Sequence, residues 1–199
     1  MAFPPIPELS ALSNLDAAKS HDALVLLCGG SSDLAAAAAG VDPRLGDVIR
    51  RALAVDASLA GSRAPHVIAA EGLPGNRLIL QGMGPLDRDI DDVRSIAEAA
   101  AQATQRAVDA GARRPAIAVA TPPEARYVRA LEVAALAALG SQWQPLEARE
   151  AGKAHPTAQA VGVIGLAADR VASLAAREAG RALCRDIAGT EPERMAPLR

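Results

Sequence analysis

The sequence predicts an α/β domain with a mixed, mostly parallel sheet, and three stretches support this expectation. The first combines a strand at Arg77–Gln81, a long amphipathic helix over Ile90–Gly111 and a strand at Pro115–Val119, the order of a right-handed βαβ unit with parallel strands. The second is Ala23–Cys28, a continuous apolar run typical of a buried strand. The third is Gly72–Asn76, a short glycine-bearing connection that favours an antiparallel hairpin between two apolar runs.

A length of 199 residues suits one large domain, or one domain with a tail. Because Pro4, Pro5 and Pro7 crowd the start, residues 1–20 are expected to form a loose arm or a short first element. The other expected elements are strands at 65–70 and 161–165, an edge strand at 142–147, an alanine-rich run at 34–39, helices at 43–59 and 167–187, and a helix that follows a cap at 121–124 and ends at Gly140.

Small and apolar residues at three-and-four spacing predict which face of each long helix is buried. For the helix over 90–111 these residues are Val93, Ala97, Ala100, Thr104, Ala107 and Gly111. For the helix that ends at Gly140 they are Val128, Leu131, Ala135, Leu136 and Leu139. For the last helix they are Val171, Leu174, Ala175, Ala182 and Leu183.

Composition argues against several classes of partner. Aromatic residues make up 2% of the chain and the net charge is −2, so stacking on single-stranded nucleic acid and binding to its phosphates are not expected. No segment approaches the roughly 20 apolar residues of a membrane span. The first residues lack the pattern of a secretory leader. We therefore expect a cytoplasmic protein without a membrane partner, in which Cys28 and Cys184 are buried and reduced.

Two glycine-rich stretches follow predicted strands, Gly29–Asp33 and Gly82–Pro85. Glycines at such positions let backbone amides face a phosphate at the start of a helix. Neither stretch fits G-x-G-x-x-G or ends in G-K-[ST], however, and an ordinary turn is the favoured interpretation.

No set of side chains in the sequence predicts catalysis or metal binding. His21, His66 and His155 each lack a second ligand three or four residues away. An acidic run supplies Asp87, Asp89, Asp91 and Asp92, but without the spacing of a calcium loop, so a role at the start of a helix is favoured. Motifs such as H-E-x-x-H, C-x-x-C and G-x-S-x-G are absent. We assign no catalytic, cofactor-binding or metal residue.

The stretch from Arg185 to Pro197 resembles the segment that enters the catalytic domain of leucyl (cytosol) aminopeptidases, approximately A-R-D-L-V-N-T-P-P-N-E-M-T-P. Six positions match, and Ile187 stands for the leucine: the matches are Arg185, Asp186, Thr190, Pro192, Met195 and Pro197. The departures are Cys184, Gly189, Glu191, Glu193 and Arg194.

The resemblance implies that the chain is the amino-terminal domain of such a protein, with a three-layer αβα fold similar to macro domains. The boundaries it suggests are an arm at 1–20, the domain at 21–187 and a linker at 188–199 towards a catalytic domain. The parent of this family removes N-terminal amino acids from peptides, acts as a hexamer and holds two divalent metals, zinc, manganese or magnesium. Its metal-binding motif N-T-D-A-E-G-R is absent from these 199 residues.

Two functions follow as expectations. The first is a non-catalytic domain that serves assembly and access to the active site of the same protein, without a cofactor of its own. The alternative is a macro-like module that binds ADP-ribose or another nucleotide in the crevice above the strand ends, at Gly29–Gly30 or Gly82–Gly84.

Overall fold

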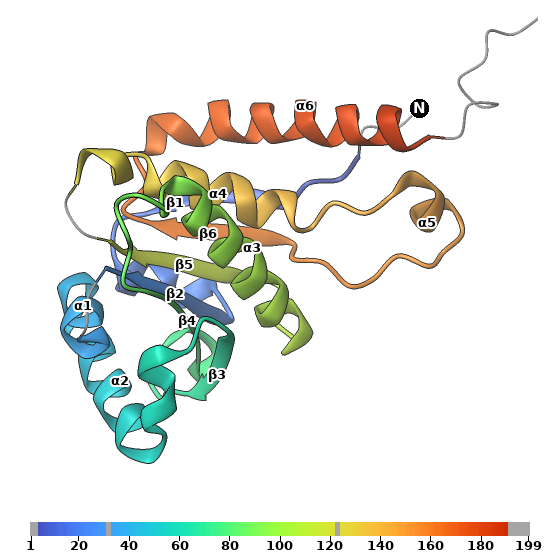
Figure 1. Cartoon of the computed structure of the whole chain (residues 1–199). Coiled ribbons are helices and arrows are strands. Elements are labelled where there is room, and N and C mark those ends of the chain that lie inside the picture. The colour runs from blue at the N-terminus through green and yellow to red at the C-terminus, as the bar shows by residue number, and fades with distance from the viewer. Residues whose placement is uncertain (1–3, 31–32, 122–123, 191–199) are drawn as a thin grey trace, which may run out of the picture.

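A single six-stranded sheet forms the centre of the computed structural model, which describes residues 4–30, 33–121 and 124–190 (Figure 1). The strand order is β1-β6-β5-β2-β4-β3. The strands are β1 (Glu8–Leu12), β2 (Ala23–Gly29), β3 (Pro65–Ala69), β4 (Arg77–Gly84), β5 (Pro115–Ala120) and β6 (Ala160–Ile164). All neighbours pair in parallel except β3 and β4, which form the predicted antiparallel hairpin. The prediction of a mixed, mostly parallel sheet is confirmed.

Helices cover both faces of this sheet, so the predicted αβα layering is also confirmed (Figure 1). The helices are α1 (Leu34–Val41), α2 (Pro43–Val55), α3 (Val93–Asp109), α4 (Ala130–Gly140), α5 (Leu146–Glu150) and α6 (Val171–Gly189). One face carries α1 and α2, and the other carries α3 and α4. The long helix α6 lies outside α4 and also contacts β1. Among the described residues, no helix combines the length and the apolar character needed to cross a membrane.

The central strand β2 joins two hydrophobic cores because successive side chains of a strand point to opposite faces. Val25 and Leu27 pack with α3, α4 and α6, whereas Leu24 and Leu26 pack with α1 and α2. Every residue of β2 is buried. It lies between β4 and β5, the two strands of the predicted βαβ unit, and pairs in parallel with both.

Of the two alternatives for residues 1–20, the loose arm is wrong for most of the described part, and the short first element agrees with the structure. Glu8–Leu12 form the edge strand β1, and Leu15–Ser20 form a 3₁₀ helix. The partner of β1 is Ala160–Ile164, near the other end of the chain. Local sequence could not reveal this pairing, because a five-residue strand owes its existence to a neighbour that far away.

The prediction of an edge strand at residues 142–147 is also wrong. This segment is a turn that runs into α5. The indole of Trp143 donates a hydrogen bond of 2.8 Å to Oδ1 of Asp186 on α6. The segment is therefore held against a helix and not against the sheet.

Helix boundaries and faces differ from prediction in detail. The first residue of α3 is Val93 and not Ile90, because Asp92 caps it through a bond from the amide of Arg94. Val128, predicted to be buried, is 83% exposed, since α4 begins only at Ala130. Some of the residues predicted to be buried are buried in each helix. They are Ala100, Thr104 and Ala107 in α3, Ala135 and Leu139 in α4, and Leu174 and Ala182 in α6.

Candidate functional site

The two predicted glycine loops lie side by side, at the carboxyl ends of β2 and β4. The amide of Gly30 donates a hydrogen bond of 3.0 Å to the carbonyl of Gly84. A Cβ atom at Gly29 would lie 2.8 Å from Cε of Met83 and 3.0 Å from Leu86. Ser31 and Ser32 lie outside the described residues. The described glycines therefore pack against each other, and the Gly30 amide serves the fold; this geometry favours the turn interpretation over a phosphate cradle.

The aspartates between β4 and α3 organise the start of the helix, as predicted. The carboxylate of Asp91 accepts bonds from Oγ of Ser95 at 2.8 Å and from the amide of Asp87 at 2.8 Å. The first of these bonds is the main reason why the pKa of Asp91 lies below its ordinary value, and the second adds to it. Asp87 in turn accepts from the amide of Asp89. Within residues 4–30, 33–121 and 124–190, no three His, Cys, Asp or Glu side chains gather in a group that could hold a metal ion.

The three histidines lie in separate parts of the molecule. His21 is buried beside Gly162, where its Nε2 atom has no hydrogen-bond partner among the described residues. His66 lies on β3, where its Nε2 shares a 2.6 Å hydrogen bond with Oγ of Ser62. His155 is exposed in a loop. None of them lies in a constellation suited to catalysis.

Both cysteines are free, but only one of them is buried. Burial raises the pKa of the Cys28 thiol to about 12, so this side chain stays protonated. Cys184 is exposed on α6, so the prediction that it is buried is wrong.

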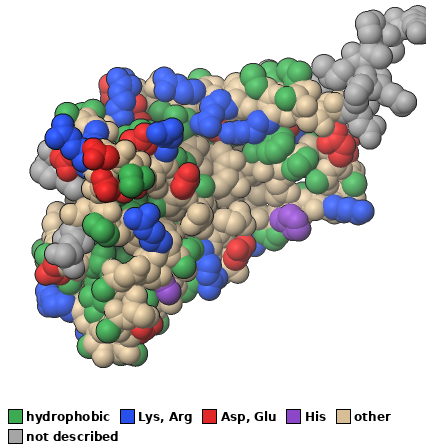
Figure 2. All heavy atoms as spheres, in the orientation of Figure 1, with side chains coloured by type: hydrophobic (Ala, Val, Ile, Leu, Met, Phe, Trp, Pro, Cys, Tyr) green, Lys and Arg blue, Asp and Glu red, His purple; other side chains and the backbone are tan. Residues whose placement is uncertain are grey.

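A set of charged side chains joins α6 to the segment after α4. Figure 2 shows that basic side chains are frequent along the edge of the molecule where α6 lies. We use the name acid–arginine cluster for six residues: Trp143, Arg149, Glu178, Arg181, Arg185 and Asp186. Glu178 is 0% exposed and Asp186 is 4% exposed. Carboxylates buried to this extent need cationic partners, because removing a charge from water costs several kcal/mol.

Each buried acid of this cluster has its own arginines. Glu178 accepts from Nη1 of Arg185 at 2.7 Å and pairs with Nη1 of Arg181 at 3.1 Å. Asp186 pairs with Nη2 of Arg149 and accepts the Trp143 indole hydrogen bond. The Asp186 contacts tie the last turn of α6 to the α4–β6 connection, whereas the Glu178 pairs lie within α6.

The cluster also fixes the end of the last helix. Oγ1 of Thr190 donates to the carbonyl of Asp186, and the Arg185 guanidinium lies 5.9 Å from the centre of the Trp143 ring. A side chain at Gly140 would meet both Arg185 and Glu178 at 3.2 Å, so the glycine that ends α4 leaves room for the pair. Arg185, Asp186 and Thr190, which carry the family resemblance, thus have structural roles; Pro192, Met195 and Pro197 lie outside the described residues.

Sequence reasoning did not find the burial of these acids, although a signal was present. The buried stripe of α6 is Leu174, Glu178, Ala182 and Asp186, a strict spacing of four. A prediction of the buried face from apolar residues alone leaves out Glu178 and Asp186. Val171, Ala175 and Leu183, which were predicted to face inward, are only partly buried.

Comparison with known proteins gives a related sequence and several related folds. No protein-family profile matches the chain. A Caenorhabditis elegans protein that is named as an aminopeptidase is 37% identical over 135 residues, which cover 64% of this chain and 25% of that protein. A variant of tomato leucine aminopeptidase matches in fold with a TM-score of 0.65 over 94% of this chain, at 14% identity. The leucyl aminopeptidase of Trypanosoma cruzi matches with a TM-score of 0.60 over 96%, also at 14% identity.

The chain is only a fraction as long as these proteins. It spans 25% of the Caenorhabditis elegans relative, 39% of the tomato chain and 38% of the Trypanosoma chain. At 14% identity the solved structures show a common fold, and the sequence relationship comes from the aminopeptidase-named relative. The resemblance to leucyl aminopeptidases is thereby confirmed at this level: a relative named as an aminopeptidase matches in sequence, and leucine aminopeptidases match in fold.

Proposed function

We propose that this chain is the non-catalytic amino-terminal domain of a metal-dependent leucyl aminopeptidase, a protein that removes N-terminal amino acids from peptides. The domain serves assembly and access to an active site located in a catalytic domain of the same protein. The observation that supports this most is the match in fold over 94% of this chain but 39% of the tomato enzyme. Such a match suits a domain of a larger enzyme.

The acid–arginine cluster gives the proposed domain a physical role. A domain that orients a neighbour needs a rigid last element, since a frayed helix end transmits no orientation. The salt bridge from Arg149 and the hydrogen bond from Trp143, both to Asp186, hold the last turn of α6 in place, and the Glu178 pairs brace the helix internally. The chain that follows Thr190 therefore leaves from a fixed position, which suits a junction between domains.

The two divalent metals of the proposed parent, zinc, manganese or magnesium, are not assigned to any residue of this chain. The described acidic, histidine and cysteine side chains do not gather in threes, and the buried acids already bind arginine. We further propose that the parent assembles as a hexamer in the cytoplasm, with this domain making contacts between subunits.

Hydrolysis of a leucyl amide tests the non-catalytic role directly. We expect the purified 199-residue chain, supplied with manganese, to give no turnover above the buffer blank, while an active aminopeptidase run in parallel releases product. Turnover that disappears on addition of a chelator would contradict the proposal.

The reading frame that encodes the chain tests the proposed partner. We expect it to continue past Arg199 and to contain N-T-D-A-E-G-R within the next few hundred codons. A stop codon directly after Arg199, with no such motif in a neighbouring frame, would remove the proposed catalytic partner.

A further inference from the structure

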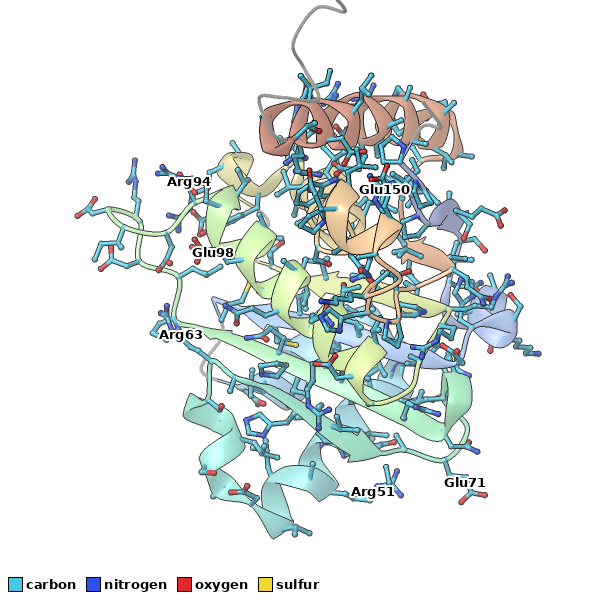
Figure 3. The ribbon with its side chains drawn as sticks, turned by 90° about the vertical axis from the view of Figure 1, so that its right-hand side faces the viewer. Arg51, Arg63, Glu71, Arg94, Glu98 and Glu150 are labelled. Atoms are coloured by element: carbon cyan, nitrogen blue, oxygen red, sulfur yellow. The ribbon has the colours of Figure 1, made fainter. Side chains whose placement is uncertain are left out.

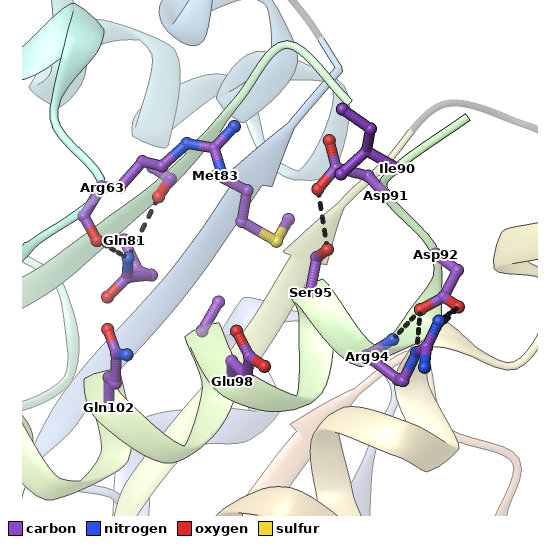
Figure 4. A pocket seen from close by; sticks show the side chains of 12 residues that line it. Arg63, Gln81, Met83, Ile90, Asp91, Asp92, Arg94, Ser95, Glu98 and Gln102 are labelled. Atoms are coloured by element: carbon purple, nitrogen blue, oxygen red, sulfur yellow. Dashed lines mark hydrogen bonds and ion pairs between the residues drawn. The ribbon is translucent and has the colours of Figure 1, made fainter. Parts of the chain in front are cut away.

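A cavity of about 450 Å³ lies between the end of β4 and the first turns of α3 (Figure 4). This volume falls within the range of small-molecule sites. Met83 and Ala99 supply apolar wall, and Ile90, which is 78% exposed, lies at the rim. Arg63 and Glu98 provide opposite charges on opposite sides of this space (Figure 4). We call it the Arg63–Glu98 cavity.

Arg63 is placed over the cavity by the second glycine loop. The side-chain amide of Gln81 donates hydrogen bonds to the carbonyls of Arg63 and Gly82. A Cβ at Gly82 would lie 2.4 Å from the carbonyl oxygen of Ser62, and one at Gly84 would lie 3.2 Å from Nε of Arg63. Only glycine permits this approach, so Gly82 and Gly84 allow the segment that carries Arg63 to lie directly against β4.

The three other charged side chains around the cavity are already satisfied. Arg94 forms an ion pair of 2.8 Å with Asp92, and Asp91 accepts bonds from Ser95 and from the amide of Asp87. Within the described chain, by contrast, the side chains of Arg63 and Glu98 form neither a hydrogen bond nor an ion pair, although Arg63 attracts Asp91 and Glu98 attracts Arg94 at longer range. One cation and one anion thus remain available to a ligand.

A third group in the cavity wall is also unsatisfied. Gln81 is 2% exposed, and its Oε1 atom has no hydrogen-bond partner in the described structure. A buried carbonyl without a donor costs free energy, which a ligand ammonium or amide group would recover. Figure 4 shows this oxygen on the side of the cavity where Gln102 lies.

We infer that the Arg63–Glu98 cavity binds a ligand that carries both a carboxylate and an ammonium group, either a free amino acid or a short peptide. The carboxylate binds the Arg63 guanidinium, and the ammonium binds Glu98 and Oε1 of Gln81. An apolar side chain of the ligand packs on Met83 and Ala99. A ligand with both charges contacts Arg63 and Glu98 together, whereas a ligand with a single charge contacts only one of them, so the cavity favours zwitterions. This inference does not depend on the proposed function.

Titration calorimetry of the 199-residue chain with leucine and with leucyl-leucine tests the inference. We expect saturable binding of at least one of the two, and their relative affinity distinguishes a free amino acid from a peptide. Leucinamide lacks the carboxylate and 4-methylpentanoate lacks the ammonium. Each of these analogues is expected to bind at least about tenfold more weakly, because it loses one charge-assisted hydrogen-bonded contact.

Variants locate the site. Arg63→Ala and Glu98→Gln should each weaken zwitterion binding at least about tenfold while leaving the melting temperature unchanged, since both side chains are exposed. Arg51→Ala and Glu71→Gln are matched controls: they carry the same charges beside a different groove, between α2 and β3 (Figure 3). The controls should bind like the unmodified chain.

Three results would overturn the inference. One is the absence of saturable binding of either zwitterion up to about 10 mM. Another is equal binding of the single-charge analogues. The last is an affinity for the zwitterion that does not change in Arg63→Ala and Glu98→Gln, or that falls by the same factor in the controls Arg51→Ala and Glu71→Gln. Because each assay uses binding and not hydrolysis, these results are separate from those that test the proposed function.

Discussion

The acid–arginine cluster and the Arg63–Glu98 cavity use the same residue types for opposite purposes. Beneath α6 the carboxylates of Glu178 and Asp186 are buried, and each has at least one arginine. Beside α3 the charges of Arg63 and Glu98 are exposed and, among the described residues, unpaired. Burial makes pairing obligatory, whereas exposure leaves a charge available to a ligand. Pairing therefore separates residues that hold the fold from those that can bind.

The largest effect is expected where a buried acid loses its partners. Replacing both Arg181 and Arg185 by methionine leaves Glu178 buried without a cation. We expect the free energy of unfolding to fall by about 3–5 kcal/mol, the usual cost of breaking a buried ion pair from one side. Urea denaturation followed by circular dichroism measures this loss.

Two further variants sharpen this result. Arg177→Met, on the exposed side of the same helix, should change the free energy of unfolding by no more than about 0.5 kcal/mol. Adding Glu178→Met to the double variant should restore most of the lost stability, because an apolar replacement of a buried ion pair is often neutral. A large loss in Arg177→Met, or no recovery in the triple variant, would show that burial of the unpaired charge is not the cause.

A smaller effect is expected from Gly82→Ala, at the base of the Arg63–Glu98 cavity. The new methyl group would lie 2.4 Å from the carbonyl oxygen of Ser62, so the backbone must shift. We expect a loss of about 1–3 kcal/mol together with weaker zwitterion binding. The same substitution at Gly40 in α1 meets no atom within 4 Å and should raise stability by up to about 1 kcal/mol. Equal losses at the two sites would exclude the steric explanation.

The His21 side chain tests whether a buried group without a partner resists taking up a charge, because its Nε2 atom has no hydrogen-bond partner among the described residues. Burial is the main reason why its pKa is lowered from 6.5; nearby Arg114 adds to this, and Asp22 opposes it. The unfolded chain therefore takes up the proton first, so stability is complete above pH 6.5 and falls as the pH drops from 6.5 to the folded-state pKa. Urea denaturation across this range should show the decline. This decline in stability should be smaller in His21→Gln and unchanged in His155→Gln. A decline that is smaller in His155→Gln and unchanged in His21→Gln would show that His21 is not its cause.

Thiol labelling compares the accessibility of the two cysteine side chains and gives the smallest expected effect, because it involves no loss of stability. Cys184 is exposed and Cys28 is buried with its pKa raised to about 12. An aromatic disulfide reagent should modify one thiol rapidly in the native protein and the second only after denaturation. Cys184→Ser should remove the rapid phase, and persistence of that phase would contradict the assigned exposure.

Continuous apolar runs and the hairpin connection made most of the fold predictable. Ala23–Gly29 is buried on both faces, and such a strand carries its own signal in the sequence. Glu8–Leu12 does not, because it is a short edge strand with exposed or half-buried positions. The edge strand predicted at residues 142–147 does not form, because the Trp143 side chain is bound to Asp186 on α6. Sequence spacing does not reveal this contact.

The candidate sites were far less predictable than the fold. Arg63 and Glu98 come from different elements and belong to no motif, so only the folded chain brings them to one cavity. The glycines at 82 and 84 were visible as a motif, but their role is to admit the Arg63 segment and not to hold a phosphate. Glu178 was not among the residues predicted to face inward, because charge is the usual mark of an exposed face, yet it is buried.

The pairing of β1 with β6 also has a consequence for biosynthesis. Residues 8–12 leave the ribosome early, yet their hydrogen-bonding partners at 160–164 are made near the end of the described chain. A nascent polypeptide therefore carries this segment without its partner strand until residues 160–164 have been made, and contacts of such long sequence separation slow folding. One border of the sheet is thus completed only when the beginning and the end of the domain meet.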